Sequence, residues 1–211
     1  MVTFRDARSL KTVFWLVFIA MTLTACAGLP GSDPTRFYVL KPATGLTPEN
    51  SLGELGPGIN VGIGPVQVPG YADRSQIITF DSGNRITVSD FDHWAEPLTE
   101  AIKRVVSADM ANLIGDERVF SYPADFRPDE KTVQVFLEIV DITQLDNGTA
   151  RLAVRWHVKK PARNEVVFRH AGVYEMQATS GDYNSYADAL TELLGRLAVD
   201  ITGSLSKLDF Q

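Results

Sequence analysis

The single cysteine of this 211-residue chain, Cys26, follows a short apolar run near the N-terminus. Three basic side chains come first, and residues 13–21 are then apolar without interruption. A basic start, a short apolar middle and small residues at its end are typical of a secretory signal peptide. A transmembrane helix is the alternative, but residues 12–25 would give only about 21 Å of helix against a hydrocarbon core of about 30 Å. The sequence therefore predicts export, with residues 1–25 as the signal peptide.

The residues around this cysteine, Leu23-Thr24-Ala25-Cys26, resemble the bacterial lipobox, in which an aliphatic residue and two small residues precede an obligatory cysteine. In that class the sulfur receives a diacylglycerol, the signal is cut before the cysteine, and the new amino group is acylated. One acyl chain holds a protein only marginally, at about 0.8 kcal/mol per buried CH₂, so the second chain matters. We predict lipid attachment at Cys26 and no other cofactor. A chance cysteine after an ordinary signal, or a buried free thiol, is the alternative.

The residue after the cysteine is Ala27 and not the Asp that favours inner-membrane retention in enteric-type sorting. We therefore expect anchoring at the outer membrane, facing the periplasm, with inner-membrane anchoring as the alternative. Residues 26–35 are small, polar and contain Gly and Pro, which predicts a flexible tether of at most about 35 Å. Residues 36–211 form the predicted folded domain.

The charge of the mature chain limits its partners. The signal holds three basic residues and one acidic residue, so the totals of 20 and 26 become 17 and 25, a net charge of −8. This acidic balance, without a basic cluster in the sequence, argues against nucleic acid and against electrostatic docking on anionic lipid headgroups. A lone cysteine also excludes an intramolecular disulfide and a cysteine-based zinc site.

Alternating apolar and polar residues predict an antiparallel sheet with one buried face. The predicted strands cover residues 36–40, 59–69, 76–80, 84–89, 131–142, 149–158 and 165–177. Gly64-Pro65 indicates a bulge or an edge strand, and Asp146-Asn147-Gly148 predicts a type I′ hairpin. Apolar stripes at helical spacing predict two helices, over about 96–114 and about 185–207. We expect an α+β fold, a mostly antiparallel sheet with both amphipathic helices on one face.

Catalytic patterns are missing from the sequence. His93, His157 and His170 have no helical partner at metal-ligand spacing, and the strand positions of the last two favour solvent-facing or cross-strand roles. No GxSxG nucleophile motif occurs. The sequence therefore predicts a non-enzyme without a bound metal, and a small periplasmic hydrolase is the least favoured alternative.

Two segments carry candidate interaction residues. Tyr71, Asp73 and Arg74 share a short loop that either is held by an internal Arg contact or binds a partner. Trp94 and Glu96 lie just before the first predicted helix. Trp94 either fills the core at the start of that helix or forms an exposed hot spot, and the sequence leaves both alternatives open.

At these segments the sequence resembles the paraquat-inducible protein C family, also described as ABC-type transport auxiliary lipoproteins or membrane integrity-associated transporter subunits. The resemblance runs from Cys26 through residues 37–40 to the C-terminal helix, with Ser75 where the family pattern has proline. The residues that carry it are Gly64-Pro65-Val66, residues 69–77, Asn84-Arg85-Ile86 and residues 94–98.

The resemblance implies a non-enzymatic part of an envelope lipid-transport system that supports membrane integrity. In such systems a protein with MCE (mammalian cell entry) domains forms a hydrophobic conduit, and the lipoprotein docks its far end at the outer membrane. The resemblance also implies a possible homo-oligomer. We take Tyr71, Asp73, Arg74, Trp94 and Glu96 as the predicted partner-binding residues. A general envelope-assembly scaffold that handles no lipid is the alternative function.

Overall fold

The computed structural model describes residues 14–15, 34–81 and 84–208. The chain divides into two compact units, Met1–Pro34 and Thr35–Gln211. In the first unit only residues 14, 15 and 34 are described, and Phe14 and Trp15 are helical and exposed. The predicted lipid-attachment residue Cys26 lies outside the described residues, as do most of the predicted signal peptide and tether.

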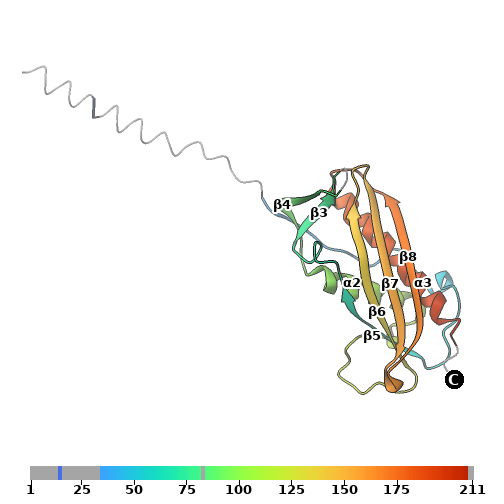
Figure 1. Cartoon of the computed structure of the whole chain (residues 1–211). Helices are drawn as coiled ribbons and strands as arrows, with labels where there is room; N and C mark the ends of the chain where they lie inside the picture. Colours follow the sequence, from blue (N-terminus) through green and yellow to red (C-terminus); the bar gives the residue numbers. More distant parts are fainter. Residues whose placement is uncertain (1–13, 16–33, 82–83, 209–211) are drawn as a thin grey trace, which may run out of the picture. The chain divides into compact units, whose positions relative to one another are not determined.

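The second unit contains the strands, the two long helices and three short 3₁₀ helices (Figure 1). In chain order the elements are β1 (Arg36–Tyr38), η1 (Pro48–Asn50), β2 (Asn60–Gln67), β3 (Gln76–Phe80), β4 (Ile86–Trp94), α2 (Leu98–Ile114), η2 (Asp116–Arg118), β5 (Val119–Ser121), β6 (Thr132–Gln144), β7 (Thr149–Lys160), η3 (Pro161–Arg163), β8 (Glu165–Gln177) and α3 (Tyr183–Leu205).

The strands form two mixed sheets. The larger sheet has the order β5-β2-β6-β7-β8, in which β2 runs parallel to both its neighbours and β6, β7 and β8 form an antiparallel meander. The smaller sheet has the order β1-β4-β3, with β1 parallel and β3 antiparallel to β4. The predicted α+β class is confirmed. The division into two sheets was not predicted, because local alternation does not reveal which distant strand becomes a neighbour.

Helices α2 and α3 pack on one face of the larger sheet and on each other (Figure 1). Their apolar stripes and the inward residues of β2, β6 and β7 make one core, which lies within Thr35–Gln211. A unit with its own core is expected to fold alone. Neither helix is long and apolar enough to cross a membrane, and the rest of the described chain holds no such helix.

The start of α3 has a strong local determinant. The carboxylate of Asp182, the N-cap residue, accepts hydrogen bonds from the backbone N–H groups of Asn184 (3.0 Å) and Ser185 (3.3 Å). These bonds satisfy N–H groups that have no partner inside the helix. The helix therefore begins at Tyr183, two residues before the predicted position.

Two predicted turns can be compared with the structure. The register of β2 against β6 shifts between Ile63 and Val66, which confirms the bulge at Gly64-Pro65, although β2 lies inside its sheet and not at an edge. The β6–β7 hairpin is present, but its predicted type I′ geometry is wrong. Only Gly148 has positive φ there (85°), and its N–H donates to the Leu145 carbonyl at 2.9 Å. This pattern is a type I turn followed by a left-handed glycine.

Candidate functional site

The loop between β2 and β3 is anchored by Tyr71. Its hydroxyl donates to Asp141 Oδ1 at 2.7 Å and accepts from the Ile142 backbone N–H at 3.3 Å, both on β6. Burial, together with the hydrogen bond to Asp141, raises the pKa of Tyr71 above its ordinary value. The loop is thus held by the tyrosine, and the predicted internal Arg contact is not what holds it.

Asp73 and Arg74 in the same loop are exposed, and neither makes an ion pair within the part of the chain that the structure describes. Their backbone is fixed by hydrogen bonds from Asp73 N to the Pro69 carbonyl (3.2 Å) and from Arg74 N to the Ala72 carbonyl (2.9 Å). A fixed backbone therefore presents two free side-chain charges of opposite sign to solvent. Partner binding by these residues stays a prediction.

The second predicted segment touches the first. The backbone N–H of Trp94 donates to the carbonyl of Ser75 at 2.7 Å, at the end of the Tyr71 loop. Trp94 is the last residue of β4, is 6% exposed, and its ring lies 6.1 Å from that of Tyr186 on α3. The structure thus has Trp94 as a core residue, the first of the two alternatives, and its indole is not exposed as a hot spot.

Glu96 makes an ion pair with Arg104 of α2, and the same guanidinium donates to the Leu40 carbonyl at 2.8 Å. The arginine therefore links the segment after β1 to the segment before α2. Both side chains are partly exposed, so the pair could still meet a partner protein. The two predicted segments form one continuous region through the Ser75–Trp94 contact, and Asp73, Arg74 and Glu96 supply its charges.

A carboxylate that the sequence analysis missed fixes the smaller sheet beside this region. Asp92 is 3% exposed and accepts from Arg36 Nε (2.7 Å), the Tyr38 hydroxyl (2.8 Å) and the Ser89 hydroxyl (2.7 Å). Burial alone would raise the pKa of Asp92, but these hydrogen bonds and the Arg36 charge hold it below its usual value. The cluster attaches β1 to β4.

A second missed carboxylate lies between the helices and the segment after β1. Asp109 of α2 is fully buried, and its Oδ1 accepts from the Ala43 backbone N–H at 2.8 Å, while Oδ2 has no hydrogen-bond partner. Burial, and next the charge of Glu192 on α3, raise the pKa of Asp109 to about 7, against the hydrogen bond from Ala43. Its position among Val105, Val106 and Met110 on the apolar stripe was a signal in the sequence.

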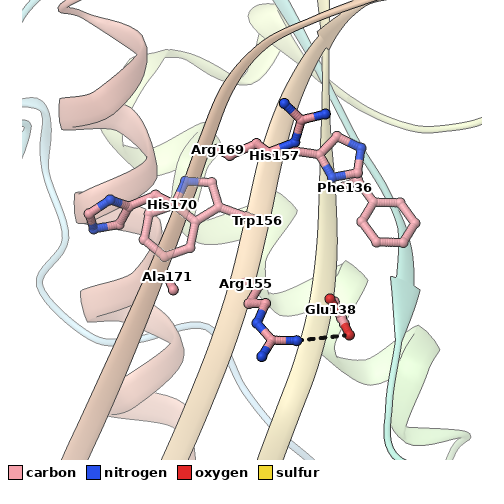
Figure 2. A pocket seen from close by; sticks show the side chains of 8 residues that line it. All are labelled: Phe136, Glu138, Arg155, Trp156, His157, Arg169, His170 and Ala171. Atoms are coloured by element: carbon pink, nitrogen blue, oxygen red, sulfur yellow. Dashed lines mark ion pairs between the residues drawn. The ribbon is translucent and has the colours of Figure 1, made fainter.

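The outer face of the larger sheet, which α2 and α3 do not cover, has an open hollow of about 380 Å³ over β6, β7 and β8 (Figure 2). Two cross-strand rows line it. The first row is Phe136, His157 and Arg169, and the second is Glu138, Arg155 and Ala171. Trp156 and His170 also line the hollow. They alternate with these residues along β7 and β8, so their side chains project to the opposite face.

His157 lies at the centre of the first row. Its ring stacks on Phe136 with the ring centroids 4.6 Å apart. Partial burial lowers the pKa of His157, the positive charges of Arg169 and Lys159 lower it further, and Glu138 opposes them. At neutral pH the imidazole is therefore uncharged, although cations surround it.

Both histidine predictions on strands are confirmed as cross-strand contacts. His157 pairs with Phe136, and the His170 ring meets Trp156 edge to face at 4.7 Å. Within the described residues, no group of three or more His, Cys, Asp or Glu side chains could hold a metal ion.

Comparison with known proteins identifies a family. The family model for an "ABC-type transport auxiliary lipoprotein component" matches residues 38–202, from β1 to α3. No curated protein matches the chain. Among solved structures, the crystal structure of an uncharacterized protein is similar with a TM-score of 0.60 and 11% identity, covering 83% of this chain and 98% of the other. Protein XCC0632 from Xanthomonas campestris, of family DUF330, is similar with a TM-score of 0.59 and 12% identity, and the match covers 80% of this chain and 93% of the other. At these identities the likeness establishes the fold alone.

Proposed function

The chain belongs to the family of ABC-type transport auxiliary lipoprotein components, and on that premise we propose that it is a non-catalytic part of an MCE-type intermembrane lipid transport system. A lipoprotein of this family is a membrane-associated envelope protein, and an auxiliary component acts together with a transport system. The proposed role is to dock the MCE conduit at the outer membrane, held there by acyl chains on Cys26, and so to support membrane integrity.

The observation that carries the proposal is the family match over residues 38–202, which is most of the folded domain. The structure adds a candidate docking region, which consists of Asp73, Arg74 and Glu96. Asp73 and Arg74 are exposed on a loop that Tyr71 fixes to β6, so they would meet a partner without first being ordered. A preordered loop loses little conformational entropy on binding.

The docking proposal is tested by exchanging the loop charges, Asp73→Arg with Arg74→Asp, in the full lipidated chain. We expect weaker pull-down of the MCE-domain protein with an unchanged unfolding curve, because both side chains are exposed and lose no ion pair to any residue that the structure describes. The matched control exchanges another exposed pair, Glu130→Arg with Arg163→Glu, which are joined at 2.7 Å. Undiminished binding of the MCE-domain protein by the loop variant would refute this docking region.

The lipid anchor is tested by growing cells on labelled palmitate and comparing the natural chain with Cys26→Ser. We expect label only on the natural chain, because the thiol is the lipid acceptor, and loss of the variant from the envelope fraction. Equal labelling would refute the anchor. Separation of the two membranes on a density gradient then distinguishes outer-membrane from inner-membrane anchoring.

The transport role is tested by co-purification of the lipidated chain followed by mass spectrometry of its partners and lipids. Recovery of an MCE-domain protein with the chain supports the role. Recovery of outer-membrane assembly proteins without an MCE protein would favour the general scaffold alternative. The mass of the purified chain in the same experiment tests the predicted homo-oligomer.

A further inference from the structure

The outward face of the smaller sheet carries exposed aromatic side chains. Phe37 of β1 is 66% exposed and Phe91 of β4 is 38% exposed, whereas Asp92 and Trp94 of β4 are buried. Phe37 lies opposite His93 in the parallel register, and their rings meet edge to face with the centroids 5.9 Å apart. Phe91 and His93 alternate with the two buried residues along β4, so they project to the side opposite the core. Phe37, Phe91 and His93 together are called the aromatic face below.

The apolar surface continues beyond the aromatic face. Val39 follows Phe37 by two residues, at the end of β1, and is 47% exposed. Single exposed apolar side chains are ordinary on a protein surface, but a cluster of them marks an interaction site. Three such side chains on two paired strands therefore indicate that something covers this end of the smaller sheet.

The place of the aromatic face in the chain indicates what covers it. Phe37 is in the first strand of the folded unit, which begins at Thr35. The predicted acyl-bearing Cys26 precedes Phe37 by eleven residues, a stretch that spans at most about 40 Å. Once the acyl chains are in a bilayer, the aromatic face meets that bilayer at an effective concentration on the order of 1 mM. A contact too weak to form between separate particles would then persist.

The charges around the aromatic face are of both signs. Arg36 is bonded to Asp92, and Arg104 is paired with Glu96. The others nearby in sequence or across the Ser75–Trp94 contact are Arg74, Asp73 and Asp90, all exposed. Cations and anions are present in nearly equal number, and the mature chain carries a net charge of −8. A surface of zwitterionic headgroups suits this arrangement better than an anionic one.

We propose that the aromatic face and Val39 form a membrane-facing surface, through which the folded domain rests on the bilayer that holds its anchor. The proposal rests on the lipid anchor at Cys26 proposed above, but it needs no MCE partner. The phenylalanine rings enter only the headgroup region, because the neighbouring charges of Arg36 and Asp90 must stay in contact with water. This contact fixes which end of the domain faces the membrane.

The test couples residues 26–211 through Cys26, the only thiol of the chain, to a maleimide-bearing lipid in phosphatidylcholine vesicles. The coupling replaces acylation by the cell, so the result does not depend on acylation in vivo. Phe37→Trp is the fluorescent reporter, and brominated phosphatidylcholine is the quencher. We expect the reporter to be quenched, most strongly by bromine atoms near the headgroup. The natural chain gives the background signal of Trp94 and Trp156, which are both buried.

Phe126→Trp is the matched control, because Phe126 is also an exposed phenylalanine. Its loop, between β5 and β6, lies at the end of the folded unit opposite β3 and β4 (Figure 1), so this reporter should not be quenched. Phe91→Gln in the Phe37→Trp chain should lower the equilibrium constant for insertion about fivefold, the effect of transferring about half of its exposed ring area. Leu52→Gln, at another exposed apolar position, should not change it. Circular dichroism verifies that each variant is folded.

The lipid composition gives a second measurement. Replacing half of the phosphatidylcholine by phosphatidylglycerol should not strengthen the quenching of Phe37→Trp, because the charges beside the aromatic face do not attract anionic lipid. Stronger quenching in the anionic vesicles would overturn the apolar contact and assign the binding to the arginines.

The remaining results decide the proposal in both directions. Quenching of the reporter at position 37 and not at position 126, weakened by Phe91→Gln, supports it. Equal quenching of both reporters, or none at position 37, would overturn it. Sedimentation of the uncoupled domain tests the rival occupant, and a dimer that Phe37→Gln dissociates would assign the aromatic face to a second copy of the chain. An unquenched reporter together with normal palmitate labelling of Cys26 in cells would overturn the membrane-facing surface and leave the anchor standing.

Discussion

The buried carboxyl of Asp109 should make the stability of the domain depend on pH in a direction opposite to that of most acidic residues. In the folded chain one oxygen accepts from the Ala43 backbone, the other has no hydrogen-bond partner, and Glu192 adds a like charge. Each of these features except the Ala43 bond disfavours the ionised form. We predict that Asp109→Asn removes this pH dependence, because an amide keeps an oxygen for Ala43 but cannot ionise.

The sign and size follow from the two pKa values. The pKa of Asp109 is 3.8 without the fold and about 7 within it. Between these values the folded chain holds a proton that the unfolded chain has released, so the free energy of unfolding falls as pH rises. This decrease in the free energy of unfolding is absent below about pH 4 and complete above about pH 7. About three pH units at about 1.4 kcal/mol each give a loss of at most about 4 kcal/mol.

The assay is urea unfolding of residues 35–211 at intervals from pH 4 to pH 8, for the natural domain and for Asp109→Asn. The stability difference between the two should move in favour of the variant by up to about 4 kcal/mol across this range. A constant offset from the unpaired amide group does not affect that change. Asp188→Asn, an exposed position on α3, is the control and should follow the natural profile. Parallel profiles for Asp109→Asn and the natural domain would refute the reasoning.

Other contacts give further expectations, each measured by urea or thermal unfolding. Tyr71→Phe removes the hydroxyl that bonds β6 and should cost about 1 kcal/mol while speeding proteolysis of its loop; an unchanged cleavage rate would show that the loop has another anchor. Asp182→Ala removes the N-cap of α3 and should also cost about 1 kcal/mol, and no loss would mean that water replaces the cap. Gly195→Ala would place a methyl group 2.6 Å from the Ala43 side chain and should cost about 1–3 kcal/mol, whereas Gly70→Ala, with open space around it, should be neutral. Equal effects of the two glycine changes would contradict the close packing at position 195.

Local patterns were sufficient for much of the fold. The alternation along residues 131–142, 149–158 and 165–177 predicted the β6–β7–β8 meander, because a sheet with one buried face imposes a period of two. The stripes of α2 and α3 were likewise predicted from helical spacing. The ends of the helices and strands were predicted less accurately. The Asp182 cap starts α3 earlier than the apolar stripe indicated, and Trp94 continues β4 where a loop was expected.

The candidate sites depended on information that the sequence does not display. Tyr71 was predicted to bind a partner or to lie in a turn held by arginine, and its true acceptor, Asp141, is 70 residues away. The charged hollow also depends on register, because a shift of one residue in β8 would move Arg169 to the helix-covered face. Asp109 was different: an acid within an apolar stripe can be seen in the sequence, and it was overlooked there.

The position of β2 between two parallel neighbours has a consequence for synthesis and assembly. Its partners β5 and β6 begin at Val119 and Thr132, far along the chain. Strand β1 likewise pairs only with β4, which follows it at a distance. Neither β1 nor β2 therefore has a hydrogen-bonding neighbour when it is first synthesised. Folding governed by such distant pairing is slow compared with that of a helical bundle. The larger sheet can therefore assemble only late in synthesis. A C-terminal truncation that removes α3 would leave β7 and β8 without the helix that covers their inner face, while α2 would still cover β2 and β5.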